Sequence, residues 1–227
     1  MQNRSYASLD AEANSTYCAF CQRSDFTANI LKETAAFLIV ADHAPLVEGH
    51  LLIIPKHHYP CYGAVPAELD AELLALKHEV QRFFVQCYAP SVFWEHGVFR
   101  QTVFHAHLHC FPFGNKSGYD LSEGLHNSVV HSQEDIRAWY ASQGHYFYME
   151  DTSSALLFAA EMDRYIHIIR GVLWHGVALR NRQTTWRSQQ QRYEEGGPLI
   201  NATKEKWHLF QRQGVGYADY TNETGAR

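Results

Sequence analysis

Three histidines, His105, His107 and His109, alternate with apolar residues near the middle of the chain. Alternate residues of a β-strand point to the same side, so this spacing predicts three imidazoles on one face. Buried imidazoles need hydrogen-bond or metal partners, which favours a face that lines a polar cleft. Two chemistries fit. The imidazoles could bind a metal ion, or one could attack phosphorus while donors such as Gln101 and Thr102 stabilise charge on the phosphoryl oxygens.

Cys18 and Cys21 form a C-x-x-C pair near the N-terminus. Such a pair can be a redox centre, half of a metal site or two reduced thiols. A redox pair sits at the start of a helix in a βαβ unit, which the surrounding residues do not predict. Zinc needs two more ligands than this pair supplies. The pair by itself therefore leaves metal binding and buried thiols open.

The composition predicts a folded protein with a large core, because 46% of the 227 residues are apolar and 14% are aromatic. The net charge of −5 is spread along the chain, which argues against a nucleic-acid partner. We see neither a signal peptide nor a stretch of about 20 apolar residues, so we expect a cytoplasmic protein with no membrane partner. Five cysteines, an odd number, argue against a disulfide framework.

The elements that would position these residues belong to an α+β fold. Short β-branched and aromatic runs predict strands over 37–41, 50–55, 91–97 and 102–111, and a hairpin over 146–161. Apolar spacing predicts helices over 66–88, 132–144, 163–176 and 189–212. We expect Ser132 to cap the second helix and Gly176 to end the third.

At the three histidines the sequence resembles the histidine-triad (HIT) family, whose signature alternates three histidines with apolar residues. The upstream elements C-x-F-C, E-T, D-H-A-P and G-H-L-L-I-I-P-K also stand in the family's order. The resemblance covers about residues 18–114. It implies an antiparallel sheet of five strands with flanking helices, usually in a homodimer joined through the long helix and a strand.

The resemblance also implies the domain organisation. We expect a flexible tail over 1–16, a HIT domain over 17–115, and a C-terminal α/β extension over 116–227 that packs on the HIT domain. The extension is rich in arginine, and Arg170, Arg180 and Arg187 are candidates to bind the distal part of a substrate.

For catalysis, the resemblance matches His107 to the family's nucleophile and His109 to the histidine that contacts the phosphoryl group. Thr102 matches a hydroxyl near the α-phosphate.

For substrate binding, Asp42 matches the acidic residue that accepts hydrogen bonds from the ribose hydroxyls. Gln101 matches a glutamine near the α-phosphate and leaving group. Arg100 replaces a small residue and either contacts a polyphosphate or points to solvent. His50 either faces the nucleotide pocket or is structural.

Some bacterial members of the family complete a zinc site with a histidine after P-K and with the first triad histidine. The implied ligands here are Cys18, Cys21, His58 and His105. Four protein ligands close the coordination sphere, so the zinc would be structural.

The implied activity is hydrolysis of a nucleotide, most simply a purine nucleotide, at its α-phosphate through a nucleotidyl-histidine. His109, where uridylyltransferases carry glutamine, favours hydrolases. The substrate would resemble a dinucleoside polyphosphate or a nucleoside phosphoramidate, and the arginines of the extension favour the former. The alternatives are a transferase or phosphorylase with an acceptor other than water, a non-catalytic nucleotide-binding protein, and a zinc hydrolase.

Overall fold

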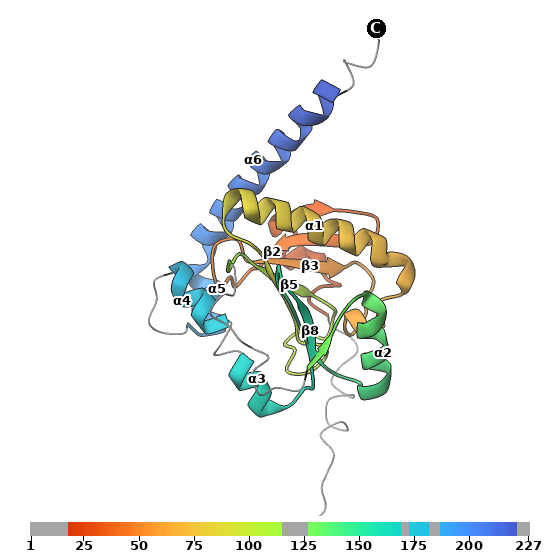
Figure 1. The fold of residues 1–227 in the computed structure, drawn as a ribbon. Coiled ribbons are helices and arrows are strands. Elements are labelled where there is room, and N and C mark those ends of the chain that lie inside the picture. The colour runs from red at the N-terminus through yellow and green to blue at the C-terminus, as the bar shows by residue number, and fades with distance from the viewer. Residues whose placement is uncertain (1–17, 115–126, 169–172, 182–186, 222–227) are drawn as a thin grey trace, which may run out of the picture.

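A computed structural model describes residues 18–114, 127–168, 173–181 and 187–221 of the chain. The described residues form one antiparallel sheet of eight strands, in the order β1-β2-β3-β5-β4-β7-β8-β6, with helices on both faces (Figure 1). The strands are β1 (Ile30–Glu33), β2 (Phe37–Ala41), β3 (Leu51–Pro55), β4 (Val92–Glu95), β5 (Leu108–Phe111), β6 (Asn127–Val129), β7 (Phe147–Glu150) and β8 (Ala155–Phe158). The helices are α1 (Asp70–Cys87), α2 (Gln133–Gln143), α3 (Met162–Ile168), α4 (His175–Asn181), α5 (Gln189–Glu195) and α6 (Gly197–Thr221). The expected α+β fold is confirmed.

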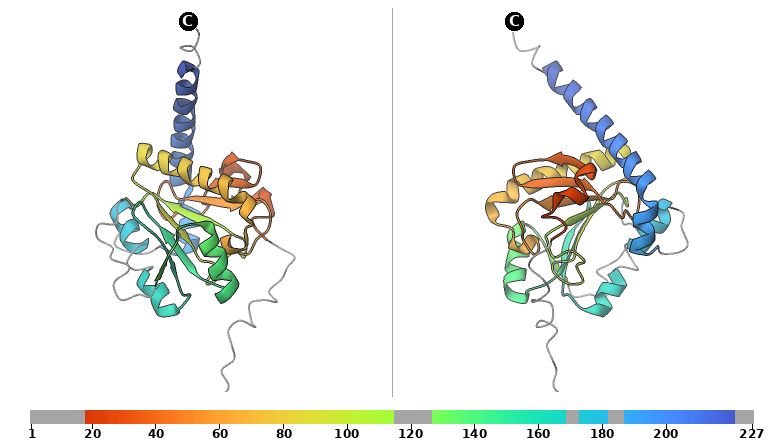
Figure 2. Two further views of the ribbon diagram at one scale, coloured as in Figure 1. Left: turned by 45° about the vertical axis from the view of Figure 1, so that its right-hand side comes forward. Right: turned by 180° about the vertical axis from the view of Figure 1, so that it is seen from behind.

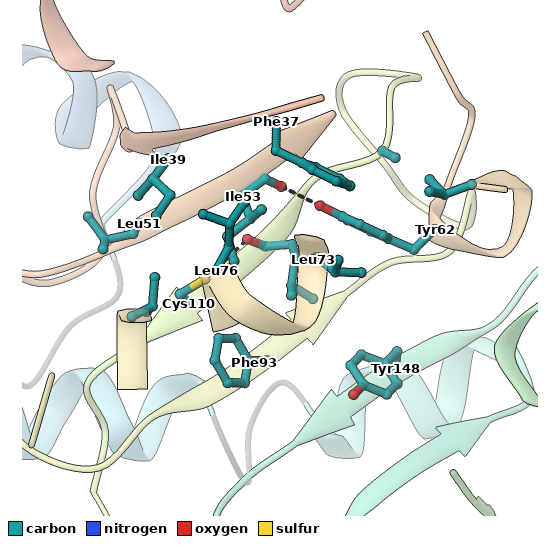
Figure 3. Packing of buried hydrophobic residues seen from close by; sticks show 14 of the residues in the cluster. Phe37, Ile39, Leu51, Ile53, Tyr62, Leu73, Leu76, Phe93, Cys110 and Tyr148 are labelled. Carbon is teal, nitrogen blue, oxygen red and sulfur yellow. Dashed lines mark hydrogen bonds between the residues drawn. The ribbon is translucent and has the colours of Figure 1, made fainter. Parts of the chain in front are cut away.

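One face of the sheet is covered by α1 and α2. The apolar stripe of α1, which includes Leu73 and Leu76, packs on β2 and β3, whose Phe37 and Ile53 are fully buried (Figure 3). Figure 3 also shows Tyr62 donating its hydroxyl to the backbone carbonyl of Ile53 at 2.9 Å. This core fixes β3, the neighbour of the strand that carries His109.

The opposite face carries two apolar patches, one on each side of β5. We call the first the β2–β3 patch; its buried members are Phe20, Phe26, Leu38, Val40, Leu52 and Ile54. We call the second the β4–β7 patch; it includes Trp94, Phe111, Phe147, Met149, Leu173 and Val177. The histidines of the predicted triad lie between the two patches.

The C-terminal half of the chain continues the sheet and covers a helix of the N-terminal half. β7 pairs with β4, on the side away from β5, and β8 and β6 follow (Figure 2). Trp207 of α6 packs edge-on against Phe83 of α1, with ring centroids 4.9 Å apart. The end of α6 projects away from the rest of the molecule (Figure 1).

Two glycines explain where the helices differ from the expectation. The helix predicted over 163–176 corresponds to α3 and the start of α4, with residues 169–172 outside the described residues. Gly176 therefore lies near the start of α4 and does not end a helix, and a Cβ there would meet the ring of Phe113 at 2.5 Å, so this position needs glycine. The predicted helix over 189–212 is two helices, α5 and α6, which meet at Gly196 beside Pro45. Ser132 forms the expected N-terminal cap of α2 together with Asp135.

The predicted strands are mostly confirmed, with one shortened and two missed. The strand expected over 102–111 pairs only from Leu108 onward, and residues 102–105 form a series of bends. β1 and β6 were not predicted. The tail over 1–16 and Arg170 lie outside the described residues.

Candidate active site and metal centre

His107 lies in the extended segment just before β5, with its ring buried beside that of His109 at 4.9 Å between centroids. Its Nδ1 is 2.7 Å from the backbone carbonyl oxygen of His105. A carbonyl oxygen only accepts hydrogen bonds, so Nδ1 carries the proton and Nε2 keeps its lone pair. Burial lowers the pKa of His107, against the opposing effects of that carbonyl and of Asp42. The ring is therefore neutral and in the tautomer that a nucleophile needs.

His109 takes the opposite tautomer through a chain of hydrogen bonds. The backbone N–H of Leu46 donates to Nδ1 of His50 at 3.2 Å, so the proton of the neutral His50 ring sits on Nε2. The Nε2–H of His50 donates to Nδ1 of His109 at 3.0 Å. Because Nδ1 of His109 accepts this hydrogen bond, the proton of the neutral His109 ring is on Nε2. Burial lowers the pKa of His50 to about 4, and burial also holds the pKa of His109 well below its usual range.

Asp42 closes this chain at the end of β2. Its carboxylate is buried, accepts from the backbone N–H of Ala44 at 2.7 Å, and lies 3.5 Å from Nε2 of His50. Burial raises the pKa of Asp42, but His50 and the Ala44 N–H outweigh it and the net shift is downward. The ligand atoms of Asp42, His50 and His109 lie within 4.8 Å of one another, a spacing that a metal could use. The N–H of Leu46 donates to Nδ1 of His50, which places the proton of the neutral His50 ring on Nε2. A metal ion would need a lone pair on Nε2, so this contact favours the hydrogen-bonded chain over a metal site.

Gln101 fastens the loop that precedes the histidines. Its Oε1 accepts from the N–H of Val98 at 3.0 Å, and its Nε2 donates to the carbonyls of Pro60 at 3.0 Å and His105 at 2.9 Å. Val98 has a φ of 77° and Arg100 a φ of 57°, which are strained for residues with a Cβ. Gln101 therefore holds a strained loop and the same carbonyl that sets the tautomer of His107.

The structure brings only part of the predicted site together. His107, His109, His50 and Asp42 form one cluster. Thr102 and Arg100 are exposed, and the side-chain amide of Gln101 is occupied by backbone partners.

The four predicted zinc ligands converge at the other end of the triad. Sγ of Cys18 lies 3.4 Å from Nδ1 of His105, Sγ of Cys21 lies 3.4 Å from Nδ1 of His58, and the four ligand atoms lie within 4.8 Å of one another. Nε2 of His105 is 2.8 Å from the carbonyl oxygen of Pro55, so it carries the proton and leaves the Nδ1 lone pair facing the thiols. A second hydrogen bond of this kind is typical of metal-binding histidines, so this Cys₂His₂ cluster could hold a metal ion.

Comparison with known proteins decides the family. A family model described as "Protein similar to CwfJ C-terminal" matches residues 10–126, just over half of the chain. Adenosine 5'-monophosphoramidase hnt1 of Schizosaccharomyces pombe is 33% identical over 127 residues, which cover 53% of this chain and 91% of that protein. The chain belongs to the histidine-triad family.

Other histidine-triad proteins match with similar coverage. Adenylylsulfatase HINT3 of Arabidopsis thaliana is 30% identical over 114 residues, which cover 48% of this chain and 58% of that protein. A Zn-bound histidine triad family protein from Mycobacterium smegmatis is 27% identical, overlaps 57% of this chain and 96% of that chain, and gives a TM-score of 0.37. Among the described residues of this histidine-triad chain, no helix combines the length and apolar character needed to cross a bilayer.

Two residues near the histidine-triad cluster were not predicted. His96 follows β4, and its ring lies 6.0 Å from that of His109. The alternation of Trp94 and His96 within the strand expected over 91–97 is a signal that could have placed His96 on this face. Arg192 of α5 donates from Nε to the carbonyl of Ala44 at 3.1 Å, a contact that no local pattern indicates.

The structure shows partners for two of the three arginines that were predicted in the extension. Arg180 lies over the ring of Tyr88, with its guanidinium carbon 5.6 Å from the ring centroid. Arg187 pairs with Glu195 at 2.8 Å.

Proposed function

We propose that this histidine-triad protein hydrolyses nucleotide conjugates at the α-phosphorus through a nucleotidyl intermediate on His107. The observation that carries the proposal is the pair of opposite tautomers in adjacent rings. His107 has a free lone pair on Nε2, and His109 has an N–H on Nε2. A nucleophile beside a hydrogen-bond donor is what attack on a phosphoryl group requires.

In the first step Nε2 of His107 attacks the α-phosphorus, and a P–N bond forms as the bond to the leaving group breaks. The leaving group departs with that electron pair and takes its proton from solvent. The Nε2–H of His109 donates to a phosphoryl oxygen, and the carbonyl of His105 stabilises the Nδ1–H of the charged His107 ring. In the second step a water oxygen bonds to phosphorus, the P–N pair returns to His107, and the water releases a proton to solvent.

The substrate we propose is a purine nucleotide. The ionised Asp42 would accept hydrogen bonds from the ribose hydroxyls, and the β2–β3 patch would receive the base. Phe20 of that patch lies 5.3 Å from the ring of His107, between centroids, so a nucleoside bound there would bring its α-phosphate to the nucleophile.

We further propose that Cys18, Cys21, His58 and His105 hold a structural zinc ion. The zinc would supply a cross-link between the N-terminal segment and the triad. Because His105 also presents its backbone carbonyl to His107 and Gln101, fixing His105 fixes the nucleophile. We also expect a homodimer in the cytoplasm, with no nucleic-acid or membrane partner.

The test is intact mass spectrometry after acid-free quenching of the protein with adenosine 5'-phosphoramidate, together with an assay for released AMP. We expect an adenylyl adduct on His107 and its loss, with turnover, in His107→Ala. His57→Ala, which removes an exposed histidine beside the metal ligand His58, is the matched control. Undiminished turnover in His107→Ala would refute the proposal.

The same assay separates the alternatives. Transfer of AMP to added phosphate or to a sugar phosphate would indicate a phosphorylase or transferase. Turnover that disappears on chelation while the fold persists would indicate a zinc hydrolase. Nucleotide binding with neither adduct nor turnover would indicate a binding protein.

A further inference from the structure

The loop between β2 and β3 joins two groups of the proposed site, Asp42 and His50. The two residues are bonded across the loop, because the N–H of Asp42 donates to the carbonyl of His50 at 3.1 Å. Inside the loop, the N–H of Ala44 donates to the Asp42 carboxylate at 2.7 Å, and the N–H of His50 donates to the carbonyl of Val47 at 3.2 Å. The position of the Asp42 carboxylate therefore follows the backbone of residues 42–50, which we call the 42–50 loop.

Arg192 of α5, in the C-terminal extension, holds the first part of the 42–50 loop. Its Nε donates to the carbonyl of Ala44 at 3.1 Å, and a terminal nitrogen donates to the carbonyl of Arg187 at 2.8 Å. Ala44 donates its own N–H to Asp42, so one residue connects the guanidinium to the carboxylate. Burial lowers the pKa of the half-buried Arg192, and the charge of Asp42 opposes the shift. The planar guanidinium, bonded in two directions, gives the loop a fixed support on this side.

Thr203 of α6 holds the last part of the loop. Its hydroxyl accepts from the N–H of Gly49 at 2.8 Å and donates to the carbonyl of Leu199 at 2.7 Å. Thr203 is only 2% exposed, so water does not compete for the Gly49 N–H. Gly49 has a φ of 85°, a left-handed conformation that turns the chain into His50. Without the hydroxyl of Thr203, this buried N–H would lose its acceptor, which is unfavourable.

The middle of the loop also packs on the extension. α5 and α6 meet at Gly196, where a Cβ would lie 2.7 Å from the ring of Pro45. Nζ of Lys206 lies 2.8 Å from the carboxylate of Glu48, which also accepts from the hydroxyl of Tyr88 at 3.0 Å. The two helices of the extension therefore contact the 42–50 loop along its length.

We propose that Arg192 and Thr203 are positioning residues through which the C-terminal extension sets how tightly Asp42 binds the ribose hydroxyls. This inference rests on the proposed function, which assigns the ribose to Asp42. Hydrogen bonds weaken steeply when their distance and angle change, so a loop released at either end should lose ribose recognition. The β2–β3 patch, proposed for the base, lies outside the loop and should keep its contribution.

The test measures binding of AMP, the product of the proposed reaction, and of 2',3'-dideoxy-AMP, which lacks both ribose hydroxyls. Isothermal titration calorimetry gives a Kd for each, and the ratio of the two isolates the hydroxyls. Because the acceptor is a charged carboxylate, we expect AMP to bind the wild-type protein about thirtyfold more tightly. A wild-type ratio near one, or no binding of AMP, would overturn the inference.

The binding test needs no hydrolysis, so it separates this inference from the proposed reaction. A protein that binds AMP with the expected ratio but releases none from adenosine 5'-phosphoramidate would refute the reaction and leave the inference standing.

Variants locate the effect. Arg192→Met removes the guanidinium, and Thr203→Val keeps the branched shape of the side chain and removes its hydroxyl. In each variant the ratio should fall about fivefold, the effect of one lost hydrogen bond, while a loss of folded protein appears in the stoichiometry and not in the Kd. Arg212→Met is the matched control, since Arg212 is an exposed arginine of α6 that donates to His208 of its own helix. A ratio within about twofold of the wild-type value would overturn the role of the residue changed.

A double-mutant cycle separates positioning from direct contact with the nucleotide. Asp42→Ala removes the ribose acceptor, so adding Arg192→Met to it should leave the Kd of AMP unchanged. A further rise of about fivefold would show that Arg192 binds the nucleotide itself and would overturn its positioning role.

Discussion

Glu95 is a carboxylate buried beneath the active site, on the face of β4 opposite to Trp94 and His96. It is 2% exposed. One oxygen accepts from the N–H of Tyr62 at 2.7 Å and the other from the hydroxyl of Tyr146 at 2.6 Å. Burial raises the pKa of Glu95 to about 7, although both hydrogen bonds oppose the shift.

This shift makes the stability of the protein depend on pH. The carboxyl has an ordinary pKa of 4.5 in the unfolded chain, and about 7 in the folded protein. Between these values the folded state binds more protons at Glu95, so the contribution of Glu95 to stability is greatest below pH 4.5 and is lost as pH rises through 7. From pH 5 to pH 8 the free energy of unfolding should lose about 2 to 3 kcal/mol through Glu95 alone.

Urea unfolding of the wild type and Glu95→Gln at pH 5 and pH 8 measures this effect. All other groups are shared, so the difference between the two proteins isolates Glu95, and it should move by about 2 to 3 kcal/mol in favour of the variant at pH 8. Glu68→Gln, which changes an exposed carboxylate, should show no such movement. A difference between wild type and Glu95→Gln that stays within about 0.5 kcal/mol across this range would refute the reasoning.

Three further changes test the rest of the architecture. Cys21→Ser removes one of the proposed zinc ligands and should lower both the zinc content, measured by plasma mass spectrometry, and the melting temperature; one zinc per chain in this variant would contradict the site. Gln101→Ala releases the strained loop and the His105 carbonyl, so kcat should fall about tenfold with KM nearly unchanged, and a loss confined to KM would speak against this positioning role. Gly97→Ala puts a Cβ 2.5 Å from the ring of Tyr146 at a φ of 53°, and urea unfolding should show a loss of about 2 to 4 kcal/mol.

Local sequence patterns predicted a structural element correctly where residues close in the sequence determine its geometry. The stripe on α1 and the cap at Ser132 follow from the sequence because they depend on neighbours three or four positions away. The Cys₂His₂ cluster was implied only by resemblance, since its ligands come from three distant segments.

The errors have tertiary causes. The strand of the triad begins late because its pairing with β3 stops at Ile53 and Leu108, and the N–H of Ala106 donates to the carbonyl of Tyr59 in a loop instead. Gly176 resembles a helix end but serves a close approach to Phe113. His96 and Arg192 reach the cluster through β4 and α5, and their sequence neighbours do not indicate where these elements pack.

The C-terminal half of the chain covers α1, the long helix through which, together with a strand, the family resemblance implies dimerisation. α6 lies on α1, and β7 occupies the edge of β4. The four side chains of the histidine cluster, Asp42, His50, His107 and His109, contact one another within one chain. Assembly of the catalytic groups therefore costs no association free energy, and dilution should leave it intact. Specific activity per chain should stay constant from nanomolar to micromolar protein, whether or not the chains also pair.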